Sequence, residues 1–97
     1  MNKDRRKQID DATKALRAAH EVYVKAIESA RGEIESARDD ESEAFDRMPE
    51  GLQGSERGET MQDIIGSLDE FIGNLQDRED DTSLLDEIDS FENDRGF

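Results

Sequence analysis

The sequence predicts an all-α protein, in which a long first helix forms an αα-hairpin with a second helix and a short acidic third helix follows. Two observations support this prediction. Apolar residues recur at steps of three and four along most of the chain, which is the spacing of one face of a helix. The only proline and three of the seven glycines fall within residues 46–59, so the residues that interrupt helices are concentrated in one place.

The composition limits what the chain can build. Hydrophobic residues make up 32% of the 97 residues and charged residues 41%, against roughly 45–50% and about 25% in average globular chains. Small domains bury a limited share of their surface even with an ordinary composition. We therefore expect one elongated helical domain over residues 1–97, without an enclosed active-site cleft.

The first helix is predicted at residues 3–47. An apolar stripe with coiled-coil spacing runs along it, with one irregular step near Tyr23. The stripe consists of Ile9, Ala12, Leu16, Ala19, Tyr23, Ile27, Ala30, Ile34, Ala37, Glu41, Ala44 and Met48. Because alanine supplies much of this stripe, a partner helix can approach closely but buries little area in each layer.

Residues 48–55 form the predicted turn. Pro49 lacks a backbone N–H and disfavours helical dihedral angles in Met48, so the first helix ends there. Gly51 and Gly54 allow the chain to reverse, and valine at either position is expected to impair folding if the φ angle is positive. Ser55 is a suitable N-cap for the next helix.

The second helix is predicted at residues 56–76, where two apolar residues in each turn lie on one face. These residues are Met61, Ile64, Ile65, Leu68, Phe71, Ile72 and Leu75. Gly66 and Gly73 lie seven residues apart on one side of this helix. Either they allow close approach of the alanines in the first helix, or they are tolerated surface glycines.

Residues 77–82 are charged and lack apolar side chains, which predicts an acidic linker. A third helix is predicted at residues 83–93, where Ser83 and Asp86 resemble a capping box. So short a helix is not stable alone in water. Either it folds back onto the stripe between Ile9 and Tyr23, which the second helix leaves uncovered, or two chains pair there. We favour the homodimer slightly.

No pattern of a catalytic, cofactor-binding or metal site is present. The chain has no cysteine and one histidine, His20, which excludes a Cys/His dyad and favours a half-buried packing role for the histidine. Residues 77–88 begin like a calcium-binding loop, but Thr82 replaces the required glycine and Ile88 the required glutamate. We therefore expect no enzyme, no cofactor and no metal.

The net charge of −14 is unevenly distributed. Residues 1–47 carry 10 basic and 12 acidic residues, whereas residues 48–97 carry 3 and 15. Such a surface repels phosphate, so nucleic acid and anionic membranes are not expected as direct ligands, and a basic protein surface is. The absence of a long apolar run and of a secretory pattern favours a cytoplasmic location.

Two surfaces are candidates for binding a partner. Carboxylates on helices can resemble the phosphates of a duplex and bind a nucleic-acid-binding protein as a decoy. The candidates are Asp69, Glu70, Asp77, Glu79, Asp80, Asp81, Asp86, Glu87 and Asp89. Alternatively, the chain is a structural or assembly adaptor, or a coiled-coil oligomer, whose C-terminal amphipathic helix docks in a groove. Its apolar residues are Leu84, Leu85, Ile88 and Phe91. The acids could also serve solubility alone.

Residues 46–70 resemble a stretch of small uncharacterised acidic helical proteins of phages and other bacterial mobile elements. The shared pattern is Pro-Glu, Leu-Gln and Ser-Glu before an amphipathic helix that ends in acids. The matching residues are Pro49, Glu50, Leu52, Gln53, Ser55 and Glu56. Small acidic phage proteins often inhibit host machinery, and some anti-CRISPR proteins imitate nucleic acid. The resemblance thus implies the hairpin corner and an inhibitor of a nucleic-acid-binding protein in a bacterial host cell.

Overall fold

The computed structural model describes residues 2–95, which form four helices. They are α1 (Lys3–Asp46), α2 (Glu50–Gln53), α3 (Glu56–Asp80) and α4 (Ser83–Arg95). No strand occurs in the described residues, so the predicted all-α class is confirmed. Among the described helices, none combines the length and the apolarity that crossing a bilayer requires.

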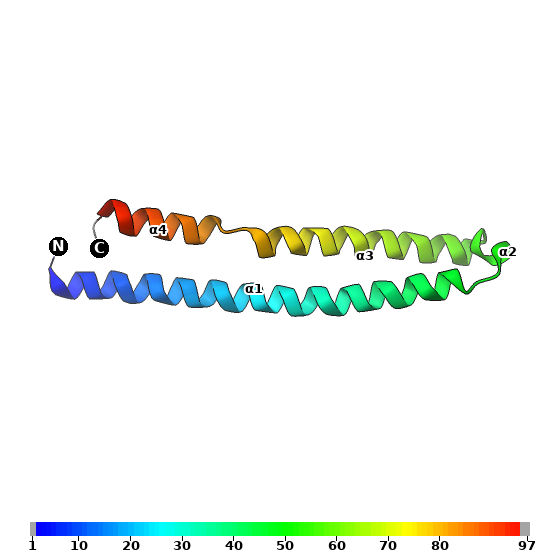
Figure 1. The fold of residues 1–97 in the computed structure, drawn as a ribbon, viewed down its shortest axis with the longest axis horizontal. Coiled ribbons are helices and arrows are strands. Elements are labelled where there is room, and N and C mark those ends of the chain that lie inside the picture. Colours follow the sequence, from blue (N-terminus) through cyan, green and yellow to red (C-terminus); the bar gives the residue numbers. More distant parts are fainter. Residues whose placement is uncertain (1, 96–97) are drawn as a thin grey trace.

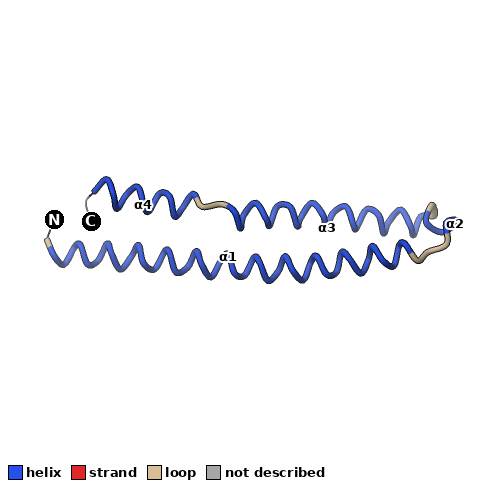
Figure 2. The backbone as a smooth tube through the Cα atoms, viewed as in Figure 1, coloured by secondary structure: helices blue, strands red, loops and turns tan. Residues whose placement is uncertain are grey.

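The helices form a flat rod two helices wide. α1 runs along its whole length, and α3 and α4 lie end to end beside α1 in the opposite direction (Figure 1). The Cα atoms extend over 74 × 18 × 14 Å. The start of α1 and the end of α4 therefore lie at the same end of the rod, and α2 lies at the other end (Figure 2). So thin a structure has one continuous interface between helices instead of a central core.

The interface between α1 and α3 repeats at alternating steps of three and four residues on both helices, which is typical of coiled-coil packing. Between residues 24 and 48 the less exposed residues include Val24, Ile27, Arg31, Ile34, Arg38, Glu41 and Phe45 of α1, and Met48 just after its end. On α3 they are Gly58, Met61, Ile65, Leu68, Ile72, Leu75 and Glu79. Ile27 and Ile72 are the most buried hydrophobic residues of this part, with 8% and 7% of their surface exposed.

The apolar stripe predicted for the first helix is wrong at about half of its positions. Every second member from Ile27 to Met48 faces inward as predicted, but seven members are exposed: Ala12, Leu16, Ala19, Tyr23, Ala30, Ala37 and Ala44. The residue after each of them is less exposed instead. Long side chains such as Arg31 and Arg38 cover more of α3 with their aliphatic stems than alanine can, and their charged heads reach acids on α3.

The turn contains an unexpected single-turn helix, α2, and the constrained glycine differs from the predicted ones. Gly54 has a φ angle of −84°, and a Cβ added at Gly51 or Gly54 would meet nothing within 4 Å. A Cβ added at Gly58 would lie 2.1 Å from the backbone oxygen of Gln53. The expectation for Gly51 and Gly54 was therefore wrong, because α2 turns the chain with ordinary backbone angles and packs closely on Gly58.

The caps of the helices agree with the sequence at the start of α3. The Ser55 side chain accepts a hydrogen bond from the backbone N–H of Gly58, as expected of an N-cap. The Gln53 amide donates to the backbone oxygen of Phe45 at 3.0 Å, which ties α2 to the end of α1. This bond satisfies one of the carbonyl groups that the last turn of a helix leaves unpaired.

The predicted acidic linker at 77–82 is mostly helical. α3 continues through Asp80, and only Asp81 and Thr82 separate it from α4. Packing extends the helix, because Glu79 lies against α1 and contacts Arg31. Gly66 and Gly73 are exposed, and a Cβ at either would meet nothing within 4 Å. They are therefore surface glycines with no role in close helix approach.

α4 lies beside the N-terminal part of α1, as in the first of the two arrangements considered for the end of the chain. The pairing of two chains stays a prediction. Ile88 is the most buried hydrophobic residue described, with 5% of its surface exposed. Arg17 of α1 pairs with Asp89 and Glu92 of α4. The third helix therefore folds back onto its own chain, although it covers α1 beside Thr13 and His20 and leaves Leu16 and Tyr23 exposed.

Candidate binding surfaces

Three arginines on α1 hold α3 and α4 through salt bridges. Arg38 Nη1 lies 2.9 Å from Asp69 Oδ1, and Arg31 Nε lies 2.8 Å from Glu79 Oε2. Arg17 Nη2 lies 2.6 Å from Asp89 Oδ1. The arginines are spaced by multiples of seven residues, so they share one edge of α1. Three of the predicted partner-binding acids, Asp69, Glu79 and Asp89, therefore bind the chain itself.

These contacts favour the charged form of the arginines. Hydrogen bonds to Glu79 and then Glu35 raise the pKa of Arg31 above its ordinary value. Hydrogen bonds to Asp69 and then Asp39 raise the pKa of Arg38 in the same way. The guanidinium groups thus neutralise part of the acidic charge inside the interface.

Glu79 is unsuited to contact a partner. Its side chain is only 8% exposed, and its Oε1 atom is buried without a hydrogen-bond partner among the described residues. Burying a carboxylate is unfavourable unless it is paired, so the Arg31 contact is needed to hold Glu79 inside. Glu79 belongs to the α1–α3 interface and is removed from the predicted binding surface.

Two further predicted acids organise the start of α4. Asp81 Oδ1 accepts hydrogen bonds from the backbone N–H and the hydroxyl of Ser83. These bonds lower the pKa of the Asp81 carboxyl, with smaller contributions from the nearby His20 and Arg78. The Thr82 hydroxyl donates to Asp86 Oδ2 at 3.1 Å. Both carboxylates remain exposed, but each also stabilises the first turn of α4.

The remaining predicted acids Glu70, Asp77, Asp80 and Glu87 are exposed. Three of them belong to a line along the side of α3 that faces away from α1. Glu70 and Asp77 each lie two residues from an interface position, and Asp80 continues the line three residues after Asp77. We call this line the acidic ridge. It consists of Glu56, Glu59, Asp63, Glu70, Asp77 and Asp80, all exposed. Within the part of the chain that is described, none of the six forms a salt bridge.

The sequence prediction missed three members of this ridge, Glu56, Glu59 and Asp63. A signal for them was present in the spacing. Gly66 and Gly73 occupy the two gaps in the line, so acid or glycine stands at alternating steps of three and four from residue 56 to residue 80. A helix with this pattern places the acids together on one side, and the glycines leave the neighbouring carboxylates unobstructed.

Most of the apolar candidates on α4 are used within the chain. Ile88 is buried, Leu85 and Phe91 are half-buried, and only Leu84 is exposed, at 39%. Leu84, Ile88 and Phe91 line a small cavity with Thr13 and Leu16 of α1. Docking of α4 in the groove of a partner would therefore require α4 to leave α1.

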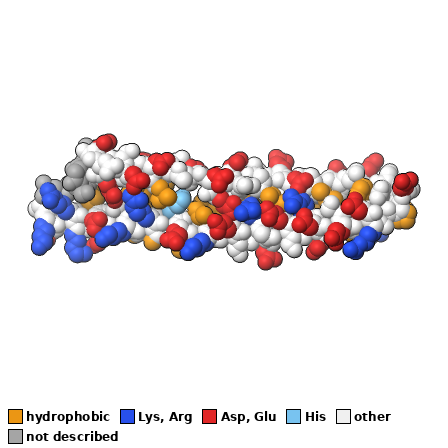
Figure 3. Space-filling view, viewed as in Figure 1, with side chains coloured by type: hydrophobic (Ala, Val, Ile, Leu, Met, Phe, Trp, Pro, Cys, Tyr) orange, Lys and Arg blue, Asp and Glu red, His pale blue; other side chains and the backbone are white. Residues whose placement is uncertain are grey.

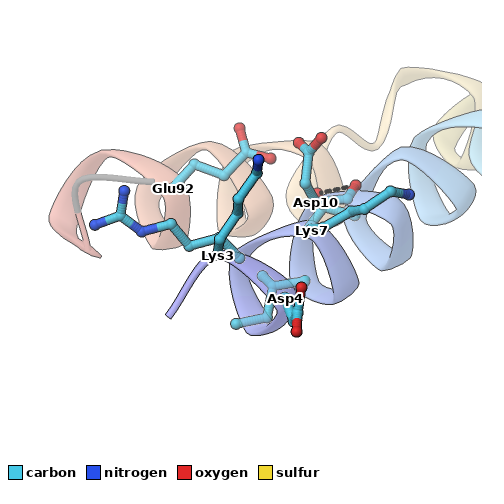
Figure 4. Close-up of a pocket in the computed structure, with 8 residues that line it drawn as sticks. Lys3, Asp4, Lys7, Asp10 and Glu92 are labelled. Atoms are coloured by element: carbon cyan, nitrogen blue, oxygen red, sulfur yellow. Dashed lines mark hydrogen bonds between the residues drawn. The ribbon is translucent and has the colours of Figure 1, made fainter. Parts of the chain in front are cut away.

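A shallow groove with a mixed charge lies where α1 begins and α4 ends. Figure 4 shows Lys3, Asp4, Lys7 and Asp10 on successive turns of α1, and Glu92 on α4. Lys7 already pairs with Asp11 at 2.8 Å, and Glu92 with Arg17 at 3.2 Å. These charges compensate one another, so the groove carries no strong preference for an anion or a cation.

His20 is half-buried, as the sequence predicted. Its ring lies 6.5 Å from the Tyr23 ring, measured between centroids, and it borders the break between α3 and α4. Within residues 2–95 there is no group of three histidine, aspartate or glutamate side chains placed to hold a metal ion.

Comparison of the chain with protein-family models, curated proteins and solved structures found no match. The function is therefore inferred from the shape, the charges and the exposed side chains described above.

Proposed function

We propose that this acidic αα-hairpin is a non-catalytic binding protein of a phage or mobile element. It inhibits a nucleic-acid-binding protein of the bacterial host by occupying its basic surface, in the manner of anti-CRISPR nucleic-acid mimics. The observation that supports this best is the acidic ridge, in which six exposed carboxylates follow one line along a long helix without a basic partner. A rigid line of unpaired anions loses little conformational entropy when it meets a basic groove.

The spacing of the ridge is compatible with that of a nucleic-acid strand. A seven-residue step on a helix advances ~10.5 Å, and three phosphates of one DNA strand advance ~10 Å along the duplex axis. Such steps separate Asp63 from Glu70 and Glu70 from Asp77. A basic groove that holds phosphates at every third position can thus contact these carboxylates as well.

The distribution of charge favours a directed encounter. On the face seen in Figure 3, carboxylates occur along the whole rod, whereas basic side chains are densest at the end where α1 begins. The ridge on α3 is far from that basic end for most of its length. Unscreened charge of one sign accelerates association with an oppositely charged surface and makes it sensitive to salt.

The test begins with capture of the target from an extract of the native host, followed by competition with DNA or RNA. The ridge variant carries Glu70→Gln, Asp77→Asn and Asp80→Asn. A matched variant carries Glu28→Gln, Glu33→Gln and Asp46→Asn, which remove the same charge from unpaired acids of α1. We expect the ridge variant alone to lose most of the affinity, and binding to weaken from about 50 to 200 mM salt as screening increases.

Two results would contradict the proposal. One is a target whose nucleic acid binds undisturbed while this protein is attached. The other is an equal loss of affinity in the ridge variant and the matched α1 variant, which would show that total charge matters and the ridge does not.

A second candidate function is that of an adaptor that uses α4. Its support is that α4 has its own capping contacts and a separate position after the break at Asp81 and Thr82, with Leu84 exposed. In this case Leu85→Ala or Phe91→Ala would abolish partner binding, and salt would have little effect, because buried apolar anchors dominate such contacts. Unchanged binding by both variants would exclude it.

A further inference from the structure

Most of the large hydrophobic side chains that the described chain leaves exposed lie on one face. Seven are exposed, and five of them are Leu16, Tyr23, Ile64, Phe71 and Leu84. Leu16 and Tyr23 are seven residues apart on α1, and Ile64 and Phe71 are seven apart on α3. This spacing keeps each pair on one side of its helix. Exposed apolar residues grouped in this way indicate a contact surface.

The two helices present these residues on the same side of the rod. Leu16, Tyr23 and Leu84 border one groove together with Arg78 of α3. Arg78 follows Phe71 by seven residues, so Phe71 and Ile64 lie on the side of α3 that carries Arg78. We call this side the apolar face. The other side is bordered by Glu21, Lys25 and Glu28 with Glu79 and Thr82, and most of its α1 residues are charged.

Small residues alternate with large ones across the apolar face. Besides Leu16 and Tyr23, α1 presents Ala26, Ala30, Ala37 and Ala44 there, all exposed. The salt bridge between Arg38 and Asp69 fixes the register of the two helices. In that register Ala37 lies level with Phe71, and Ala44 lies level with Ile64. Each large side chain of α3 thus lies beside an alanine of α1, whose small side chain leaves a shallow depression in the surface.

We propose that the apolar face binds the same face of a second copy of this chain, giving a four-helix bundle. A two-fold axis along the rod places α1 of each copy on α3 of the other, so that Phe71 and Ile64 fill the shallow positions at Ala37 and Ala44. The face measures 74 by 18 Å between Cα extremes, which exceeds the ~800 Å² per partner of a standard stable interface. A self-complementary patch of this kind is what a two-fold dimer requires.

The proposal is independent of the acidic ridge. The ridge lies on the outer side of α3, so a dimer formed through the apolar face leaves two ridges exposed. The two interactions also respond oppositely to salt. Each chain carries a net charge of −14, so two chains repel each other and salt strengthens the dimer by screening. Salt weakens the binding of the ridge to a basic partner.

The mass in solution tests the proposal. We expect sedimentation velocity of the full chain at micromolar concentrations to show twice the 11.0 kDa of one chain, with tighter association at about 0.5 M than at about 0.05 M salt. Tyr23→Glu on the apolar face is expected to raise the dissociation constant at least tenfold, and so is Phe71→Glu. Val22→Glu is the matched control, because Val22 is 68% exposed and points away from that face.

Cross-linking tests the arrangement of the copies. The chain has no cysteine, so Asp40→Cys and Ser67→Cys each introduce a single thiol on the apolar face, at levels that meet in the proposed dimer. A mixture of the two variants should form the mixed disulfide readily, and Asp40→Cys alone should not. A wild-type monomer under all these conditions, or equal dissociation by Val22→Glu and Tyr23→Glu in variants with wild-type helicity, would overturn the dimer. Failure of the mixed disulfide in a dimer would overturn the two-fold axis.

Discussion

The two halves of the rod are built on the same continuous helix but are held together differently. Near the turn, α1 meets α3 through aliphatic and aromatic side chains such as Ile27, Ile34 and Ile72. At the open end, α1 meets α4 through Thr13, Arg17 and His20, with Ile88 as the one buried apolar side chain among the described residues there. Buried apolar area is the main source of stability, so the α4 half should open first.

The comparison also shows how ionic contacts are used. Arg17 holds α4 by two carboxylates, at 2.6 and 3.2 Å, on a largely exposed edge. Arg31 holds Glu79 where that carboxylate is 8% exposed. Exposed ion pairs contribute little to stability, whereas a buried carboxylate depends on its partner. Arg31 is therefore needed for the α3 half, and Arg17 mainly positions α4.

The largest effect is expected for Ile72→Ala in the α3 half. Ile72 is 7% exposed, and removing a buried side chain of this size typically costs about 2–5 kcal/mol. Urea unfolding followed by circular dichroism measures the change. Val22→Ala is the control, because Val22 is 68% exposed and should change stability by less than about 0.5 kcal/mol. Similar losses in both variants would show that the α1–α3 interface is not where the structure places it.

Next in size is Gly58→Ala, at the turn end of the same half. Its Cβ would lie 2.1 Å from the Gln53 oxygen, so α2 must shift, and forced repacking of this kind costs about 1–3 kcal/mol. Gly54→Ala should instead be neutral or stabilise by up to about 1 kcal/mol, since its Cβ meets nothing within 4 Å and alanine restricts the unfolded chain. Equal unfolding midpoints for the two variants would contradict the tight contact at Gly58.

Ile88→Ala tests whether the α4 half opens independently of the α3 half. We expect the amides of α4 to lose hydrogen-exchange protection while those of α3 keep theirs, because local opening requires breaking only the contacts of α4 with α1. The loss in global stability should be smaller than for Ile72→Ala. A parallel loss of protection in α3 and α4 would mean that the rod unfolds as one unit and that the halves are equally stable.

The smallest effect concerns pH at the start of α4. Hydrogen bonds from Ser83 lower the pKa of Asp81 below the ordinary aspartate value of 3.8. The folded state therefore holds this proton less tightly than the unfolded state, so the stabilisation is complete above that value and is lost as pH falls through the folded pKa. We expect exchange protection of α4 to weaken below about pH 4. Asp81→Ala should weaken the exchange protection of α4 already at neutral pH. It should also make the loss of this protection below about pH 4 smaller. Unchanged protection in Asp81→Ala would contradict the capping role.

Several features of this protein could be predicted from residues that are close together in the sequence. α1 ends just before Pro49, and Ser55 caps α3 by accepting a hydrogen bond from the backbone N–H of Gly58, three residues later. Both depend on residues within one turn, so the sequence alone determined them. The steps of three and four likewise determined that the chain is helical almost throughout.

Only the tertiary structure decided which side of each helix faces inward. Two stripes on α1 share the same spacing and differ by one residue, and the choice between Ala37 and Arg38 depends on Asp69, which lies 31 residues away in the sequence. The same long-range contacts pair Asp69, Glu79 and Asp89 with arginines of α1 and leave the ridge exposed. Gly58 became critical because α2 folded against it. Periodicity identifies faces of a helix, but the partner that covers a face is set by side chains far along the chain.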